Sequence, residues 1–268
     1  MTIARISRRD LAIAMTASGA IPPAAGMAAA AASGPEPAGV TYPRTISWSG
    51  FTWSVKESGN SAVGPGGNRF SAATRAVRVD AAGVLRLRIE RRRGFWRCAE
   101  IVAEPAGAFG YGVYEWTLAS PVKAIAPHAI LGLFTWDNTS SAQANREIDV
   151  ELGRWPNSPG YPNASFTVQP YTHRGNTHPF PIPGAARPVT VGFTWSAGQV
   201  VFKAARGGSL VPADSALVID TWTRRTADVP APGNEQPRIN LWLPDALLPV
   251  KGKPIEVALS AFRFTPLP

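Results

Sequence analysis

Short runs of β-branched and aromatic residues, separated every few residues by proline or glycine, constrain the fold of this chain most strongly. The chain has 26 prolines and 25 glycines among its 268 residues. The β-rich runs cover 77–79, 84–90, 98–104, 111–119, 129–136, 147–153, 164–171, 189–195, 199–204, 238–243 and 255–264. Such spacing is typical of an all-β sandwich or barrel. With no helical heptads, repeat or low-complexity linker after about residue 40, we expect a single domain over residues 33–268.

The run 147–153 places three acids, Glu147, Asp149 and Glu151, at alternate positions, with Ile148 and Val150 between them. In a strand, alternate side chains project from one surface, so the three carboxylates would share one face of a sheet. A helix would also bring positions 147 and 151 together, but it would put position 149 on another side. The β-branched residues and the glycine and proline that follow favour the strand.

This acidic string needs an explanation. With 18 Asp and Glu residues in the chain, it is expected by chance about 0.08 times. Like charges on one strand face repel each other. The acids could lie on a solvated outer face, meet Arg146, Arg154 or other basic groups, or bind a hard cation. Aromatic residues crowd the same stretch: Trp136, Trp155, Tyr161 and Tyr171. They favour a sugar-cleaving cleft, which combines flat apolar faces with two carboxyl groups.

The spacing of the acids sets a geometric condition. Four residues along a strand span about 13 Å between α-carbons, whereas the two carboxyl groups of a retaining glycosidase lie about 5 to 5.5 Å apart. Two Glu side chains leaning toward each other on a concave, twisted sheet close most of that gap, and a flat or convex sheet does not. The shorter Asp149 would hydrogen-bond one partner, and its charge would help keep the other carboxyl protonated.

The motif EIDVE in this setting resembles the active-site strand of glycoside hydrolase family 16, which includes laminarinases, lichenases and xyloglucan endotransglycosylases. Further stretches similar to strands of this family lie at 109–122, 132–138, 191–204 and 239–243. The similarity covers nearly all of the chain after residue 32. It implies a concanavalin-like jelly-roll β-sandwich with an open substrate cleft across a concave sheet.

By position, the resemblance implies that Glu147 is the nucleophile, Asp149 the assisting residue and Glu151 the acid/base. Glu151 would protonate the leaving oxygen while Glu147 attacks the anomeric carbon, and would then activate water to release the glycosyl-enzyme. The anomeric configuration would be retained. The strand lacks the extra residue of the bulged EIDxxE form found in many laminarinases, so it is closer to the lichenase and transglycosylase type.

Candidates for substrate contacts surround the motif. They are Trp136, Trp155, Gln169, Tyr171, Asn240 and Trp242. The tryptophans at 136 and 155 flank the acids and would stack on sugar rings, or else pack in the core or on a sheet face. The residues at 240 and 242 share one strand face, as do those at 169 and 171, whose polar groups would bind sugar hydroxyls.

We expect neither a cofactor nor a metal ion. His173 and His178 are placed too loosely for a metal pair, so we interpret both as loop residues. Family members often bind calcium through an Asp in the final strand, where this chain reads AFRF at 261–264. Cys98 is the only cysteine, so no intramolecular disulfide can form, and we expect it to pack as a small hydrophobic residue.

The net charge of +9 at pH 7 is mostly dispersed. The dense basic run consists of Arg86, Arg88, Arg91, Arg92, Arg93 and Arg97. We interpret it as a solvated strand and turn rather than a nucleic-acid patch, so no nucleic-acid partner is expected. Binding of an anionic polysaccharide to this basic surface is an open alternative.

The first 32 residues have a basic start, an Ala-rich apolar run and small residues suited to cleavage, as in an export signal. Residues 7–11, SRRDL, resemble the twin-arginine type. The alternatives are an ordinary secretory signal and an uncleaved anchor. We therefore expect a periplasmic or secreted monomer that is free of the membrane once the signal is removed.

Together, these features predict an exported retaining endo-glycosidase that hydrolyses internal β-glycosidic bonds of a polysaccharide, with β-glucan as the first choice. One alternative is a transglycosylase, which would pass the same intermediate to another sugar. Another is a non-catalytic, lectin-like carbohydrate-binding protein on the same sandwich. The paired acids argue against the last, because binding alone does not need both Glu147 and Glu151.

Overall fold

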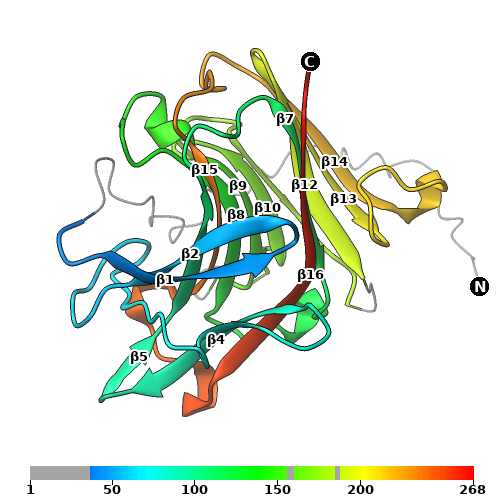
Figure 1. Cartoon of the computed structure of the whole chain (residues 1–268). Helices are drawn as coiled ribbons and strands as arrows, with labels where there is room; N and C mark the ends of the chain where they lie inside the picture. The colour runs from blue at the N-terminus through cyan, green and yellow to red at the C-terminus, as the bar shows by residue number, and fades with distance from the viewer. Residues whose placement is uncertain (1–36, 156–159, 185–187) are drawn as a thin grey trace, which may run out of the picture.

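The computed structural model describes residues 37–155, 160–184 and 188–268, whose strands form two large antiparallel sheets packed face to face (Figure 1). The predicted export signal over residues 1–32 lies outside the described residues. Sheet 1 runs in the order β1 (Thr41–Trp48), β2 (Phe51–Glu57), β6 (Ala99–Glu104), β15 (Gln236–Trp242), β8 (Ile130–Trp136), β9 (Ile148–Gly153), β10 (Ala164–Val168) and β11 (Thr177–Phe180).

Sheet 2 packs against sheet 1 and carries no part of the acidic motif. Its order is β14 (Val218–Arg225), β13 (Gln199–Arg206), β12 (Val189–Ser196), β7 (Gly112–Leu118), β16 (Ile255–Pro266), β4 (Leu85–Arg92) and β3 (Val77–Val79), with β5 (Phe95–Arg97) paired to β4. Short 3-10 turns connect some strands: η1 (Val122–Ala124), η2 (Ala144–Arg146), η3 (Ser215–Leu217), η4 (Pro244–Ala246) and η5 (Val250–Gly252). Within the described ranges, no helix is long and apolar enough to cross a membrane. The two sheets confirm the prediction of an all-β sandwich.

The core lies between the sheets, where apolar side chains from neighbouring strands stand in register. One row across sheet 1 consists of Val55, Ile101, Ile239, Leu133, Val150 and Phe166. Every member of this row is fully buried. The strand interpretation of the acidic motif is therefore confirmed, since Ile148 and Val150 face the core and the alternate positions face outward. Glu147 itself lies one residue before the start of β9.

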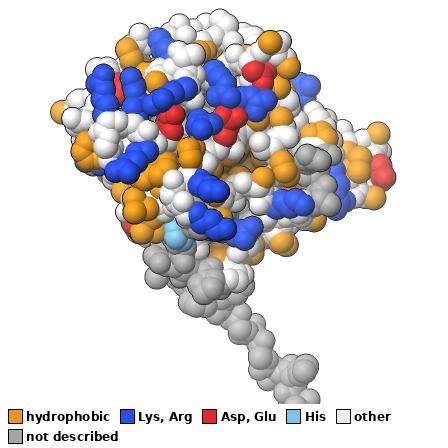
Figure 2. Space-filling view, turned by 90° about the horizontal axis from the view of Figure 1, so that it is seen from below, with side chains coloured by type: hydrophobic (Ala, Val, Ile, Leu, Met, Phe, Trp, Pro, Cys, Tyr) orange, Lys and Arg blue, Asp and Glu red, His pale blue; other side chains and the backbone are white. Residues whose placement is uncertain are grey.

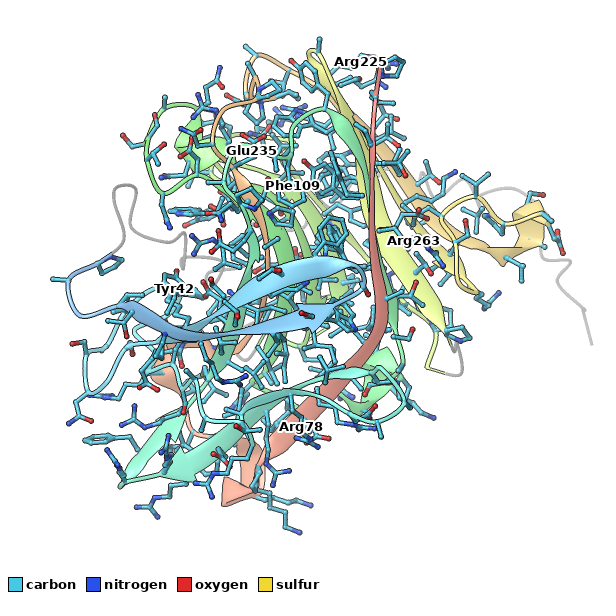
Figure 3. All side chains as sticks on the ribbon, in the orientation of Figure 1. Tyr42, Arg78, Phe109, Arg225, Glu235 and Arg263 are labelled. Atoms are coloured by element: carbon cyan, nitrogen blue, oxygen red, sulfur yellow. The ribbon has the colours of Figure 1, made fainter. Side chains whose placement is uncertain are left out.

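Aromatic rings connect the two sheets. The ring of Phe166 in β10 stacks on that of Phe202 in β13, with centroids 5.0 Å apart. Phe109, labelled in Figure 3, contacts Phe51 of β2 and Phe264 of β16 at centroid distances of 5.9 and 5.2 Å. The sandwich is thus held together by direct aromatic contact across its interior.

Replacing Phe166 with Ala will lower the free energy of unfolding by about 3–5 kcal/mol, because a fully buried ring is lost and a cavity remains. Chemical denaturation at constant pH measures this loss. Val211→Ala is the control: its side chain is 78% exposed, so the change should stay within about 0.5 kcal/mol. Similar losses for the two variants would contradict the assigned position of the core.

Two of the sequence expectations are wrong in detail. The run 164–171 was expected to be one strand, but β10 ends at Val168, because Pro170 has no N–H to continue a ladder. His178 was expected in a loop, but it lies in β11, with Nε2 3.0 Å from Oδ1 of Asp220. His173 lies in the turn between β10 and β11. Both histidines contact aspartates, which local sequence does not reveal.

Cys98 is fully buried, and its thiol donates to Oδ1 of Asn68 at 3.2 Å, which confirms the packing prediction. Burial raises the pKa of the Cys98 thiol, so it stays protonated. The side chains of Arg86 and Arg88, on β4, pair with Glu256 at 3.2 and 3.4 Å. Figure 2, which views the molecule from the end near β4 and β5, shows Lys and Arg side chains spread over the surface with acids among them.

Candidate active site

The strand β9 lies between β8 and β10, and its register fixes what stands beside each acid. Glu151 is opposite Gly132 of β8 and Ser165 of β10, whereas Asp149 is opposite Phe134 and Thr167. These residues alternate with the core-facing ones, so the acids share the outer face of sheet 1. The Asp149 side chain is nevertheless 6% exposed. The carboxyl groups therefore sit in a hollow and not on a solvated strand face.

A pocket of about 330 Å³, part of it open to solvent, lies over this row. It is lined by Pro65, Gly132, Phe134, Glu147, Asp149, Glu151, Asn240 and Trp242. The structure thus brings all three predicted catalytic residues into one pocket, together with two of the predicted substrate-binding residues. Pro65 belongs to the loop after β2 and forms part of the wall.

Gly132 leaves space that the pocket uses. A Cβ atom at this position would lie 2.5 Å from Oδ1 of Asn240, on the neighbouring strand β15. Asn240 and Glu151 are the residues opposite Gly132 on its two sides. The missing side chain therefore lets the Asn240 amide lie over β8, one strand away from Glu151.

A chain of hydrogen bonds that starts at Gln169 orients Asp149 and Glu147. Nε2 of Gln169 donates to Oδ2 of Asp149 at 2.9 Å, and Oε1 of Gln169 accepts from the N–H of Tyr171 at 2.8 Å. Asp149 in turn shares a hydrogen bond with Glu147. Gln169, predicted to bind substrate, thus orients Asp149, and Asp149 holds Glu147. The Tyr171 ring is not among the groups that line the pocket.

Burial raises the pKa of all three carboxyl groups. Glu151 reaches about 8, from burial first and then from the negative charge of Asp149. Asp149 reaches about 7, since burial outweighs its hydrogen bonds with Gln169 and Glu147. Burial and the charge of Asp149 also raise the pKa of Glu147 well above its ordinary value. Because Glu147 and Asp149 share a hydrogen bond, they titrate as a coupled pair.

A buried charge network adjoins this pair on sheet 1. Arg238 of β15 pairs with Glu100 of β6 at 3.0 Å, and Lys56 of β2 pairs with the same carboxylate at 3.2 Å. The positive charge of Arg238 lowers the pKa of Glu147, against the effect of burial. Sequence reasoning missed these residues. The signal that could have found Arg238 is its alternation with Asn240 and Trp242 in one strand.

The predicted stacking tryptophans occupy different places. Trp242 lines the pocket and is 3% exposed, and the ring of Trp155 packs edge-on against it at 5.8 Å. Trp155 belongs to the core cluster and is 7% exposed. Trp136 is 5% exposed and donates from Nε1 to Asn138 at 2.8 Å. Phe134, which was not among the residues predicted from the sequence, lines the pocket, whereas Trp136 and Trp155 do not.

Tyr161 lies close enough to the acids to sense Glu151. Burial and the charge of Glu151 raise its pKa to about 12. The phenol therefore stays protonated and can serve as a hydrogen-bond donor at neutral pH. The chain has no group of three or more His, Cys, Asp or Glu residues placed to hold a metal ion, as far as its described residues go.

The raised carboxyl pKa values give stability a definite pH dependence. A folded-state pKa above the unfolded value means that the folded state binds more protons between about pH 4.5 and 8, so the unfolding free energy falls as pH rises. Glu151, whose pKa rises from 4.5 to about 8, accounts for about 2–4 kcal/mol of this fall in unfolding free energy after allowance for its partial exposure. Glu151→Gln will flatten the fall, as measured by denaturant unfolding at pH 5 and pH 8. An equal fall in both proteins would contradict the burial of this carboxyl.

Comparisons with known proteins bear on the fold. No protein-family model matches the chain, and no curated protein matches it by sequence. Among solved structures, the β-glucanase of Bacillus licheniformis is 16% identical, with a TM-score of 0.56 over 88% of this chain and 97% of that one. A prokaryotic β-1,3-1,4-glucanase from a mouse hindgut metagenome is 15% identical, with a TM-score of 0.55 over 80% and 93%.

A third similar structure, from Mycobacterium tuberculosis, is described as an immunostimulatory antigen and pseudo β-1,3-glucanase. It is 19% identical, with a TM-score of 0.54 over 87% of this chain and 96% of that one. At such identities these likenesses establish the fold alone. The chain therefore has the jelly-roll β-sandwich fold found in β-glucanases, as the sequence predicted.

Proposed function

We propose that this chain is a retaining glycoside hydrolase that cleaves internal β-glycosidic bonds of a polysaccharide, with β-glucan as the substrate class. The observation that carries the proposal is the meeting of Glu147, Asp149 and Glu151 in one pocket, each with a raised pKa. Pairs of carboxyl groups whose protonation is tuned by burial are what acid-assisted glycoside cleavage requires. The glucanase fold and the EIDVE motif support placing the chain, as a divergent member, in glycoside hydrolase family 16.

In the first step, Glu151 acts as the acid. With a pKa of about 8 it is protonated at neutral pH, so it can give its proton to the glycosidic oxygen as the bond to the anomeric carbon breaks. Glu147 attacks that carbon from the other face and forms an ester. For this attack Glu147 must be ionised and the proton of its hydrogen bond with Asp149 must lie on Asp149, and the charge of Arg238 favours the ionised form of Glu147.

In the second step, Glu151 acts as the base. It takes a proton from water, whose oxygen attacks the anomeric carbon and displaces Glu147, so that two inversions give net retention. A second sugar hydroxyl in place of water would give glycosyl transfer through the same intermediate. We propose that the reaction takes place outside the cytoplasm, after export, on a monomeric enzyme.

A non-catalytic role is the second candidate, because one protein of this fold is described as a pseudo-glucanase. The fold alone therefore does not decide between catalysis and sugar binding. The intact acids favour catalysis, since three buried carboxyl groups in one pocket destabilise the fold at neutral pH, and simple binding does not need them.

Product analysis tests the proposal. The purified protein is incubated with soluble β-1,3-, β-1,4- and mixed-linkage glucans, xyloglucan and galactans, and the products are weighed by mass spectrometry. We expect oligosaccharides of several lengths at early times from at least one β-glucan, each carrying one added water. When an oligosaccharide of defined length is the substrate, products longer than that oligosaccharide would assign glycosyl transfer. Binding without any product from the whole panel would overturn the enzyme assignment in favour of a lectin-like role.

A further inference from the structure

The segment just before Glu147 adopts a conformation that L-amino acids avoid. Gln143, Ala144, Asn145 and Arg146 have positive φ values of 52°, 49°, 58° and 53°, so they form a left-handed turn without glycine. Left-handed backbone brings Cβ close to the following carbonyl oxygen, so such residues normally occur singly. At Glu147 the backbone is extended again, with φ −84°. The chain therefore enters β9 from a strained turn that its surroundings hold in place.

One side-chain hydroxyl brackets Glu147 from both sides. Oγ1 of the fully buried Thr135 donates to the carbonyl of Arg146 at 2.7 Å and accepts from the N–H of Ile148 at 3.2 Å. The peptide groups before and after Glu147 are thus fixed to β8. The position of the Glu147 carboxyl consequently depends on the conformation of the turn that precedes it.

The residues that follow β8 also hold the turn, through hydrogen bonds of backbone and side-chain amide groups. The N–H of Asp137 donates to the carbonyl of Asn145 at 2.7 Å. Nδ2 of Asn145 donates back to the carbonyls of Asp137 and Ser140 at 3.0 and 3.1 Å. The buried Asn145 side chain therefore closes a hydrogen-bonded ring between the turn and the residues after β8.

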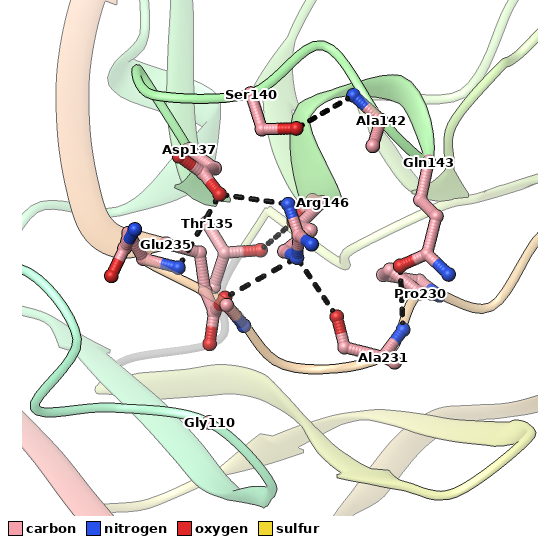
Figure 4. Close-up of polar contacts among 12 residues, drawn as sticks. Gly110, Thr135, Asp137, Ser140, Ala142, Gln143, Arg146, Pro230, Ala231 and Glu235 are labelled. Atoms are coloured by element: carbon pink, nitrogen blue, oxygen red, sulfur yellow. Dashed lines mark hydrogen bonds and ion pairs between the residues drawn. The ribbon is translucent and has the colours of Figure 1, made fainter.

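A buried ion pair between Arg146 and Asp137 also holds the turn (Figure 4). We call this ion pair, together with the contacts of Thr135 and Asn145 described above, the clamp. Nη1 of Arg146 donates to Oδ2 of Asp137 at 2.8 Å, and Nε donates to the carbonyl of Ala231 at 3.0 Å, with Glu235 4.0 Å away. Asp137 is 1% exposed and Glu235 is fully buried. Loss of one partner of such a pair leaves the other charge uncompensated.

Asp137 is the centre of the clamp. Its Oδ1 accepts from both the N–H and the hydroxyl of Thr139, at 2.7 and 2.6 Å, and its Oδ2 accepts from the N–H of Asn234 at 3.3 Å. Although burial raises it, these hydrogen bonds and Arg146 hold the pKa of Asp137 below its ordinary value. Asp137 therefore remains an anion at neutral pH and is the counter-ion on which the Arg146 guanidinium depends.

We propose that Asp137 is a positioning residue for Glu147, because through Arg146 it holds the left-handed turn that directs the Glu147 carboxyl group toward Asp149 in the pocket. This inference rests on the proposed function, since it gives Asp137 a role in the reaction of Glu147. Without the anion, Arg146 moves to find water or another acceptor, and the turn relaxes to ordinary backbone. The reacting carboxyl is then displaced, while the rest of the pocket still binds sugar.

Asp137→Asn tests the proposal with little change of shape. We expect kcat to fall by about tenfold or more while KM changes by less than about twofold, because a displaced nucleophile slows the chemistry and not the binding. The matched control is Asp80→Asn. Asp80 also accepts backbone N–H groups, from Ala82 and Val84 at 3.0 Å each, and pairs with Arg86 at 2.7 Å, but it lies beside sheet 2. This variant should leave kcat and KM unchanged.

A measurement that does not depend on activity separates the positioning role of Asp137 from the proposed function. Carbon-13 NMR of the side-chain carboxyl groups follows the titration of the Glu147 and Asp149 pair in the absence of substrate. In Asp137→Asn the pair should lose its coupling and titrate closer to ordinary values, and in Asp80→Asn it should not change. A wild-type protein that is inactive on every glucan would overturn the proposed function, while this titration would still decide the role of Asp137.

A second, rescuing substitution distinguishes an effect on the left-handed turn from a general loss of stability. Glycine adopts positive φ freely, so adding Ala144→Gly to Asp137→Asn should restore kcat severalfold, whereas adding it to Asp80→Asn should not alter kcat. If Asp137→Asn does not fold, Arg146→Lys, which keeps the charge but not the bond to Ala231, takes its place in both assays. Wild-type kcat and an unchanged pair titration in a folded variant would overturn the proposal.

Discussion

Glu147→Gln will reduce glucan hydrolysis by about a thousandfold or more, because the amide cannot form the ester on which the two-step reaction depends. The replacement keeps the size of the side chain, and a buried amide avoids the cost of a buried charge. The variant should therefore be folded, and at pH 8 it should be at least as stable as the wild type. Initial rates on the best β-glucan of the panel and denaturant unfolding measure the two effects together.

A matched control separates this loss from a general effect of Glu→Gln substitution. Glu115 of β7 also accepts a hydrogen bond, from the N–H of Leu210 at 2.9 Å, but it belongs to sheet 2. Glu115→Gln should keep activity within about twofold. A Glu147→Gln variant that retains a tenth or more of wild-type activity would remove this residue from the nucleophile role.

Small anions extend the test to stereochemistry. In Glu147→Ala, azide can occupy the space of the missing carboxylate and attack the anomeric carbon directly. One displacement inverts the configuration, so the product will be an α-glycosyl azide from a β-linked substrate with a good leaving group. Proton NMR of the product reports the anomeric configuration. A β-glycosyl azide from this variant would show that the residue does not attack the sugar.

Glu151→Ala will show the second largest effect, and its size will depend on the leaving group. Removal of a general acid typically costs about a hundred- to ten-thousandfold on substrates that need protonation. A β-glucan needs a proton on the departing oxygen, whereas a dinitrophenyl glycoside does not. We therefore expect a large loss on glucan, but nearly unchanged formation of the glycosyl-enzyme from the activated glycoside. A similar loss on both substrates would contradict the role of acid.

The same variant should also lose its base. After a burst of dinitrophenol, the glycosyl-enzyme will accumulate, and added azide will release it as the β-glycosyl azide, opposite to the product from Glu147→Ala. The alkaline limb of kcat/KM, which the pKa of about 8 places near that pH in the wild type, should disappear in Glu151→Gln. Stopped-flow absorbance and pH–rate profiles measure these changes.

The sequence predicted the central part of the fold because the inner strands follow simple rules. Runs such as 129–136 and 238–243 are rich in β-branched and aromatic residues, and they correspond to β8 and β15 within a few residues. The edge strand β3 was predicted as the run 77–79, but the edge strands β1, β11 and β14 were missed. The edge strand β14 is half exposed along its length, and β1 and β11 contain prolines, so their patterns do not resemble buried strands.

The acidic motif could be read from sequence because strand alternation alone decides which side chains share a face. The residues that surround the motif in space could not be predicted from the sequence. Arg238 meets Glu100 and Lys56 only through the order of strands distant in sequence. Gln169 turns to Asp149 because β10 ends just before it. The left-handed turn before Glu147 has no glycine to announce it, so only its tertiary contacts could reveal it.

The proposed mechanism requires that Glu147 become covalently bound to the sugar, and this bond can be trapped. A 2-deoxy-2-fluoro glycoside with a good leaving group forms the ester quickly and releases it slowly, because the fluorine destabilises both oxocarbenium-like transition states. Intact-protein mass spectrometry followed by peptide mapping should show one fluorosugar, attached to Glu147. A label on Glu151 or Asp149, or hydrolysis with inversion and no trapped ester, would contradict the role of Glu147 as the nucleophile.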